Sequence, residues 1–79
     1  MKQENKNLIT KDITIKGHYN LVLKCGNKYN IRYGIHQGVH EYVGTTTEGE
    51  HLFKKDDKVT FGYYSKTSPY EFTNIVKPI

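Results

Sequence analysis

Cationic, imidazole and amide side chains recur at alternate positions in the first half of the chain. They are Lys16, His18, Asn20, Lys24, Lys28, Asn30 and Arg32. No acidic residue lies between Ile13 and Arg32. Groups of this kind bind phosphate oxygens through charge and hydrogen bonds. If the segment is a β-hairpin, alternation places them on one face as an unneutralised cationic surface, which indicates a nucleic-acid backbone as partner.

Aromatic side chains would supply the second contact that single-stranded nucleic acids need, since stacking contributes roughly 1–3 kcal/mol per base. Tyr19, Tyr29 and Tyr33 share the parity of the apolar residues around them, so we expect them in the core. Tyr42 and Tyr64 fall on the outward parity of their predicted strands and are the expected stacking residues. The predicted nucleic-acid-binding residues are Lys16, His18, Lys24, Lys28, Asn30, Arg32, His36, Tyr42 and Tyr64.

The sequence gives little indication of a metal-binding site. The chain has four histidines and one cysteine, and the only close pair of histidines is His36-x-x-x-His40, which straddles a predicted Gln-Gly turn. A zinc site needs three or four converging ligands. We therefore predict no metal and no cofactor, and expect the histidines to be exposed.

Catalysis is also not indicated. Cys25 is flanked by Lys24 and Lys28, which could lower the pKa of its thiol, but a lone cysteine beside an apolar strand is more often a small buried residue. Asp56-Asp57 lies in a lysine-flanked turn, where solvation explains the paired carboxylates. The sequence predicts no catalytic residue and a protein that is not an enzyme.

The strands that would position these side chains are read from period-two alternation. Segments 13–25 and 29–35 alternate on either side of Gly26-Asn27, which predicts a hairpin with Leu23 near Tyr29 or Ile31. Gly17 is predicted to mark a bulge or a bend. Further strands are expected at 39–43, 59–64 and 70–76, with either one helical turn near residues 48–54 or a short strand at 51–53.

Composition supports an all-β protein. Alanine and tryptophan are absent, whereas isoleucine, valine, threonine, tyrosine and phenylalanine are plentiful. A chain of 79 residues is expected to form a single domain over residues 11–79, after a flexible tail at 1–10. A single cysteine indicates a reducing, cytoplasmic setting, and no apolar run approaches the roughly 20 residues of a membrane span.

Charge distribution matters more than net charge here. The net charge of +4 comes from 12 basic and 8 acidic residues, and lysine used in place of arginine is typical of an AT-rich genome, such as that of a low-GC bacterium, its phages or its mobile elements. The acidic residues are concentrated in the second half of the chain, which genome composition does not explain. They include Glu41, Glu48, Glu50, Asp56, Asp57 and Glu71.

Five short antiparallel strands, a glycine bend in the first and the closing segments "VTFGYY" and "EFTNIV" resemble the oligonucleotide/oligosaccharide-binding (OB) fold. An SH3-like barrel is the alternative. The resemblance implies a small five-stranded barrel with a binding surface on its second and third strands and the flanking loops.

Two functions follow as expectations. The first is binding of single-stranded DNA or RNA with low sequence preference, in phage or mobile-element replication or recombination. The second is a protein-binding module, either an accessory subunit of a replication enzyme or a phage inhibitor of a host defence system, whose acidic stretch between Glu48 and Asp57 would mimic phosphates. Neither involves a membrane.

Overall fold

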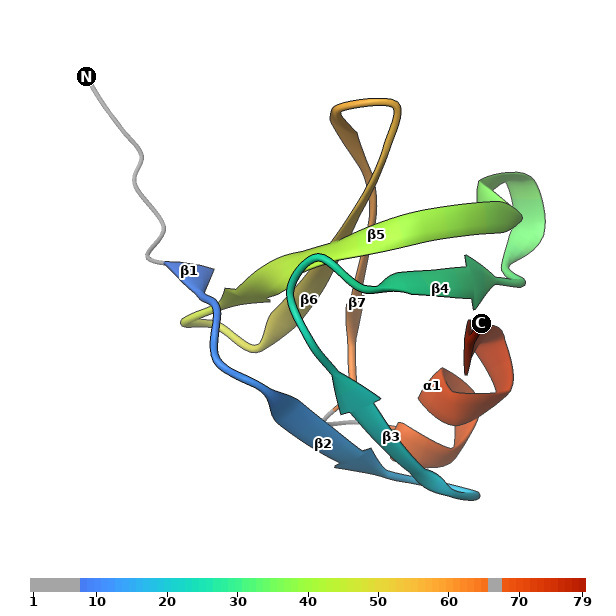
Figure 1. Ribbon diagram of the computed structural model, residues 1–79. Coiled ribbons are helices and arrows are strands. Elements are labelled where there is room, and N and C mark those ends of the chain that lie inside the picture. Colours follow the sequence, from blue (N-terminus) through green and yellow to red (C-terminus); the bar gives the residue numbers. More distant parts are fainter. Residues whose placement is uncertain (1–7, 66–67) are drawn as a thin grey trace.

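The computed structural model describes residues 8–65 and 68–79, so residues 1–7 of the predicted tail lie outside the described part (Figure 1). The elements in chain order are β1 (Leu8–Ile9), β2 (Ile13–Lys16), β3 (Asn20–Leu23), β4 (Lys28–Ile31), the short 3₁₀ helix η1 (Gly34–His36), β5 (Gly38–Thr46), β6 (Glu50–Lys55), β7 (Lys58–Tyr64), α1 (Pro69–Ile75) and β8 (Val76–Pro78). The described strands form two antiparallel sheets, which confirms the all-β class.

The larger sheet has the strand order β7-β6-β5-β4-β8, and β1 pairs with β5. The smaller sheet is the β2-β3 hairpin. Figure 1 shows this hairpin below β4 and β5, with α1 beside it. The expected helical turn near residues 48–54 is absent, because this segment is the strand β6, paired with β5 on one side and β7 on the other.

The predicted hairpin across Gly26-Asn27 is wrong. The chain does turn there, with the Asn27 N–H donating to the Lys24 carbonyl, but β4 then pairs with β5 and β8 and not with β3. β2 and β3 instead pair with each other across Gly17, with Ile13 opposite Leu23. A Cβ on Gly17 would collide with Thr73 and with the Pro69 carbonyl, so α1 packs closely on this bend. The basic side chains are therefore divided between two sheets.

The expected strand at 70–76 is also wrong. Residues Pro69–Ile75 form α1, with Pro69 in its first turn, where a fixed φ suits helix initiation. Phe72 and Ile75 have the i, i+3 spacing of one helix face, and both are buried. The helix thus fills the interior between the two sheets.

The core contains side chains from both sheets and the helix. They are Ile15, Leu21, Leu23, Tyr29, Ile31, Tyr42, Phe53, Phe61, Phe72, Ile75 and Val76. Tyr29 is buried and Tyr19 packs against the core as predicted, but Tyr33 is exposed because β4 ends at Ile31 before it. Of the helices that the structure describes, none is long and apolar enough to cross a membrane.

Candidate nucleic-acid interface

The outer face of the larger sheet carries two rows of cross-strand neighbours. Opposed residues on adjacent antiparallel strands share a face. Glu41 on β5 lies opposite Lys28 on β4 and Lys54 on β6, and the Lys28 Nζ is 3.7 Å from a Glu41 oxygen. Asn30 lies opposite Val39 on β5 and Lys77 on β8. Two of the predicted residues, Lys28 and Asn30, are thus exposed on one sheet face.

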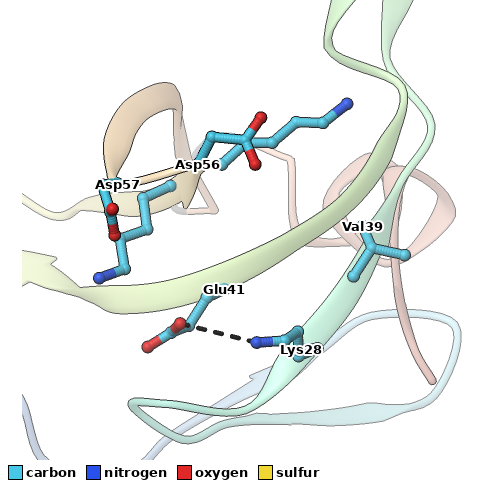
Figure 2. A pocket seen from close by; sticks show the side chains of 7 residues that line it. Lys28, Val39, Glu41, Asp56 and Asp57 are labelled. Atoms are coloured by element: carbon cyan, nitrogen blue, oxygen red, sulfur yellow. Dashed lines mark ion pairs between the residues drawn. The ribbon is translucent and has the colours of Figure 1, made fainter.

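A shallow hollow lies on this face, where the β6-β7 turn approaches β4 and β5. Its lining residues are Lys28, Val39, Glu41, Lys54, Lys55, Asp56 and Asp57. Figure 2 shows the Lys28–Glu41 ion pair, with Asp56 and Asp57 coming from the turn. Lysines and carboxylates line it in equal numbers, so a bound phosphate would have to compete with carboxylates for the ammonium groups.

A second hollow adjoins the first and shares Lys55 with it. Its other lining residues are Ile35, His36, Gln37, His40 and Thr60. The Lys55 side chain extends over Gly38, where an added Cβ would lie 3.1 Å from Nζ. The predicted residue His36 is therefore close to a cation that sequence reasoning did not include. We call the two hollows together the β4–η1 strip, which extends from Lys28 through Lys54 and Lys55 to His36.

An aromatic cluster borders the strip at η1. The ring centroid of Tyr33 lies 5.6 Å from that of Phe61, 5.8 Å from that of Tyr63 and 6.5 Å from that of His36. Phe61 and Tyr63 stack at 5.9 Å. Burial, and then a hydrogen bond to Glu71, raise the pKa of the Tyr63 phenol. Sequence parity placed Tyr33 in the core, although Gly34 directly after it was a signal that the strand ends there.

Tyr42 cannot stack on a base, which corrects the prediction. Its ring is fully buried against Phe53, and its hydroxyl lies 2.5 Å from Thr45 Oγ1. His40 and Tyr42 share the inward parity of β5, whereas the sequence had predicted Tyr42 on the outward parity. Tyr64 is exposed as expected, but it pairs with Glu50 at the end of β7 distant from the β6-β7 turn.

The predicted residues on the smaller sheet lie apart from the strip. Lys16 is exposed on β2, and the exposed His18 ring makes an edge contact with Tyr70 at 5.1 Å. Lys24 Nζ is 4.0 Å from an Asp12 carboxylate oxygen. Asp12 and Glu41 thus supply carboxylates to Lys24 and Lys28, and the expectation of an unneutralised surface is wrong.

Arg32 is the remaining predicted cation. Its side chain is exposed at the end of β4, and its backbone N–H donates to the Ile75 carbonyl at 2.8 Å. This bond fixes the backbone just after β4, immediately before Tyr33 of the aromatic cluster. Arg32 lies two residues before η1 and is not among the residues that line either hollow.

Two of the histidines are buried, contrary to expectation. His40 donates from Nδ1 to the Gly38 carbonyl at 3.1 Å, and His51 lies between Thr45 Oγ1 at 2.7 Å and Ser65 Oγ at 2.8 Å. Burial lowers the pKa of His51 to about 4, so its imidazole is neutral at pH 7. Among the residues that the structure describes, no three histidine, cysteine, aspartate or glutamate side chains converge as a metal site would require.

Cys25 is exposed, not buried as expected. Its Sγ lies 3.2 Å from the Thr10 carbonyl and 3.1 Å from the Val43 carbonyl. Partial burial and then Asp12 raise the pKa of the thiol. This is opposite to the direction that activates a cysteine nucleophile.

The arrangement therefore offers a mixed-charge sheet face that leads to a cation and an aromatic cluster at η1. These groups can bind a ligand without catalysis: the ammonium groups attract anions, the amides form hydrogen bonds and the ring faces stack on flat groups. Comparison with protein-family models, with curated proteins and with solved structures finds no match for this chain.

Proposed function

We propose that this protein binds single-stranded nucleic acid, with little sequence preference, along the β4–η1 strip. One observation carries the proposal: the two hollows share Lys55, so a lysine-bearing sheet face continues into a hollow lined by the imidazole of His36. Proteins that bind single strands combine a cationic path for the backbone with rings for the bases. The small, mostly antiparallel β architecture is also consistent with an OB-like fold, and such folds bind oligomers on a strand face.

The salt dependence of binding tests the proposal. If Lys28, Lys54 and Lys55 each neutralise one phosphate, log K should fall with log salt at a slope of about −2 for a single strand. The measurement is fluorescence anisotropy of a labelled oligothymidylate and a matched oligouridylate of twelve nucleotides at low and moderate salt. Absence of binding at micromolar protein and low salt would overturn the proposal.

Paired charge reversals locate the surface. Lys54→Glu with Lys55→Glu should weaken binding at least tenfold, because both side chains line the strip. Lys16→Glu with Lys24→Glu changes the net charge by the same amount at exposed residues outside the strip, one on β2 and one directly after β3. If the second pair weakens binding as much as the first, only the overall charge matters and the strip is not the site.

A second candidate function is binding of a protein partner. A groove between β3, β4 and the C-terminal residues is lined by Val22, Gly26, Asn27, Lys28, Tyr29, Pro78 and Ile79, and both Val22 and Ile79 are exposed apolar residues. Apolar side chains around a groove favour a protein partner such as a replication or defence protein. Phosphate mimicry is less favoured, because Glu48 and Glu50 lie at one end of β6 and Asp56 and Asp57 at the other. A pull-down from the host in which Val22→Lys loses a protein, while oligonucleotide binding is absent, would support this candidate.

A further inference from the structure

We infer that the Tyr33–His36 aromatic pair at η1 is the place where one unpaired base stacks. This inference rests on the proposed function and adds the residues that would contact a base. The sequence had assigned stacking to Tyr42 and Tyr64, and the fold buries the first. Tyr33 takes its place because its ring is both accessible and held in position.

The Tyr33 ring is held by its neighbours. Phe61, Tyr63 and His36 all lie within 6.5 Å between centroids, yet 44% of Tyr33 remains exposed. Ring pairs at such distances attract one another. A side chain that is already fixed loses little conformational entropy when a ligand stacks on it.

The backbone sets the orientation of the pair. Gly34 has a φ of +53°, which lets the chain turn tightly after β4, and the His36 N–H donates to the Tyr33 carbonyl at 2.8 Å. The Tyr33 and His36 ring planes consequently lie within 5° of each other. Ring faces of a single orientation suit a flat ligand such as a nucleobase.

The surroundings favour a nucleotide over an aliphatic side chain. The adjoining hollow contains Gln37 and Thr60, whose exposed polar groups can bond the edge of a base, and Lys55, which can pair with its phosphate. Ile35, 95% exposed, adds an apolar contact beside the pair. A planar ring with a polar edge and an attached anion matches all of these features.

The chain offers a matched control in Tyr64. It is 43% exposed, almost the same as Tyr33, but within the described residues it has no aromatic neighbour. If exposure alone determined stacking, the two tyrosines would contribute equally. The inference requires that only Tyr33 contributes.

The test measures oligothymidylate affinity by anisotropy for Tyr33→Leu, Tyr33→Phe and Tyr64→Leu. Tyr33→Leu should weaken binding about 5- to 150-fold, the range expected for loss of one stacked base. Tyr33→Phe keeps the ring and should bind within about twofold of the wild type, as should Tyr64→Leu. In parallel, a 2-aminopurine placed in the oligonucleotide should be quenched by the wild type and by Tyr33→Phe but not by Tyr33→Leu.

The failures of the two proposals are distinguishable. If the wild type binds the oligonucleotide and Tyr33→Leu binds equally well, this inference is overturned and the proposed function stands. If the wild type binds no oligonucleotide, both are overturned. Thermal unfolding identifies a Tyr33→Leu variant that fails to fold, in which case His36→Leu takes its place and must reduce both affinity and quenching.

Discussion

Buried polar side chains at one end of β5 and β6 satisfy one another in a chain of hydrogen bonds. Tyr42, Thr45, His51 and Ser65 are linked in that order by contacts of 2.5, 2.7 and 2.8 Å. A buried polar group without a partner costs free energy, so these bonds permit a tyrosine and a histidine in the interior. The alternation of residue types along the strands could not predict this chain of hydrogen bonds, because its members meet only after a β-bulge between Tyr42 and Gly44 shifts the register.

The buried His51 predicts a pH dependence of stability. Its pKa is lowered from 6.5 to about 4 in the folded protein, so between these pH values the unfolded chain binds more protons. The free energy of unfolding should be constant above about pH 6.5 and fall as the pH decreases, by about 2 kcal/mol between pH 7.5 and 5. Urea unfolding at several pH values measures this loss.

His51→Gln is the variant that isolates the effect, because it removes the titrating group at a buried position. The variant will be less stable at neutral pH, but its stability should change much less between pH 7.5 and 5. His18→Ala, at an exposed histidine, should keep the wild-type profile. Equal pH profiles for wild type and His51→Gln would contradict the prediction.

At the scale of elements, the β6-β7 hairpin was predictable from local sequence. Asp56 and Asp57 have φ values of +54° and +68°, the conformation of a two-residue type I′ turn, and Lys55 lies opposite Lys58. Aspartate tolerates this region better than most residues. The turn positions Lys54 and Lys55 at the strip. The backbone conformation at this end of the strip could therefore be predicted from the types of the turn residues.

Substitutions at Asp57 test this turn. Asp57→Ala should destabilise the protein by about 1 kcal/mol, because a Cβ-bearing residue without a short polar side chain is strained at positive φ. Asp57→Gly removes the same charge without that strain and should be no less stable than the wild type. Chemical denaturation of both variants compares them, and equal losses would show that the carboxylate, not the backbone, determines the effect.

The helix α1 was missed although its signals were present. Pro69 at the start and the i, i+3 spacing of Phe72 and Ile75 fit a helix, but a seven-residue segment rich in aromatic and β-branched residues also fits a strand. The deciding factor is tertiary, since the Phe72 ring packs against His51, Phe53 and Tyr63 in the interior.

Phe72→Ala should therefore destabilise the protein by about 3–5 kcal/mol, the usual cost of removing a buried phenylalanine ring. Tyr70→Ala on the same helix should cost less than about 1 kcal/mol, because Tyr70 is exposed. Thermal unfolding of the two variants separates the values. Similar losses would contradict the position of Phe72 in the core.

For the molecule as a whole, alternation predicted which segments are strands but not which strands are neighbours. Ile13, Leu23 and Ile31 point inward as expected, yet β3 and β4 belong to different sheets. The predicted basic face consequently divides at Gly26-Asn27, and Asp12 and Glu41 approach its lysines from elsewhere in the chain. Strand pairing depends on contacts between residues that are distant in the sequence, and the local pattern of residue types does not specify these contacts.

Side-chain hydrogen bonds join the two sheets where no strand ladder does. The Tyr29 hydroxyl on β4 donates to the Val22 carbonyl at 2.8 Å and accepts from the Lys24 N–H at 2.9 Å, both at the end of β3. Tyr19 in the β2-β3 turn likewise donates to the Val76 carbonyl at 2.8 Å. The position of the smaller sheet therefore depends on tyrosine hydroxyls as well as on the shared core.

Tyr29→Phe should lower the free energy of unfolding by about 1–3 kcal/mol, because it leaves a backbone donor and a backbone acceptor without their partner. The effect should also be local. Hydrogen exchange should accelerate at the amides of β2 and β3, whereas those of β5 and β6, whose ladders are unchanged, should keep their protection relative to global unfolding. Tyr64→Phe, at an exposed hydroxyl, should change neither quantity. If β2 and β3 lose no more protection than β5 and β6, the two sheets unfold as one unit, and the Tyr29 hydroxyl is not what connects them.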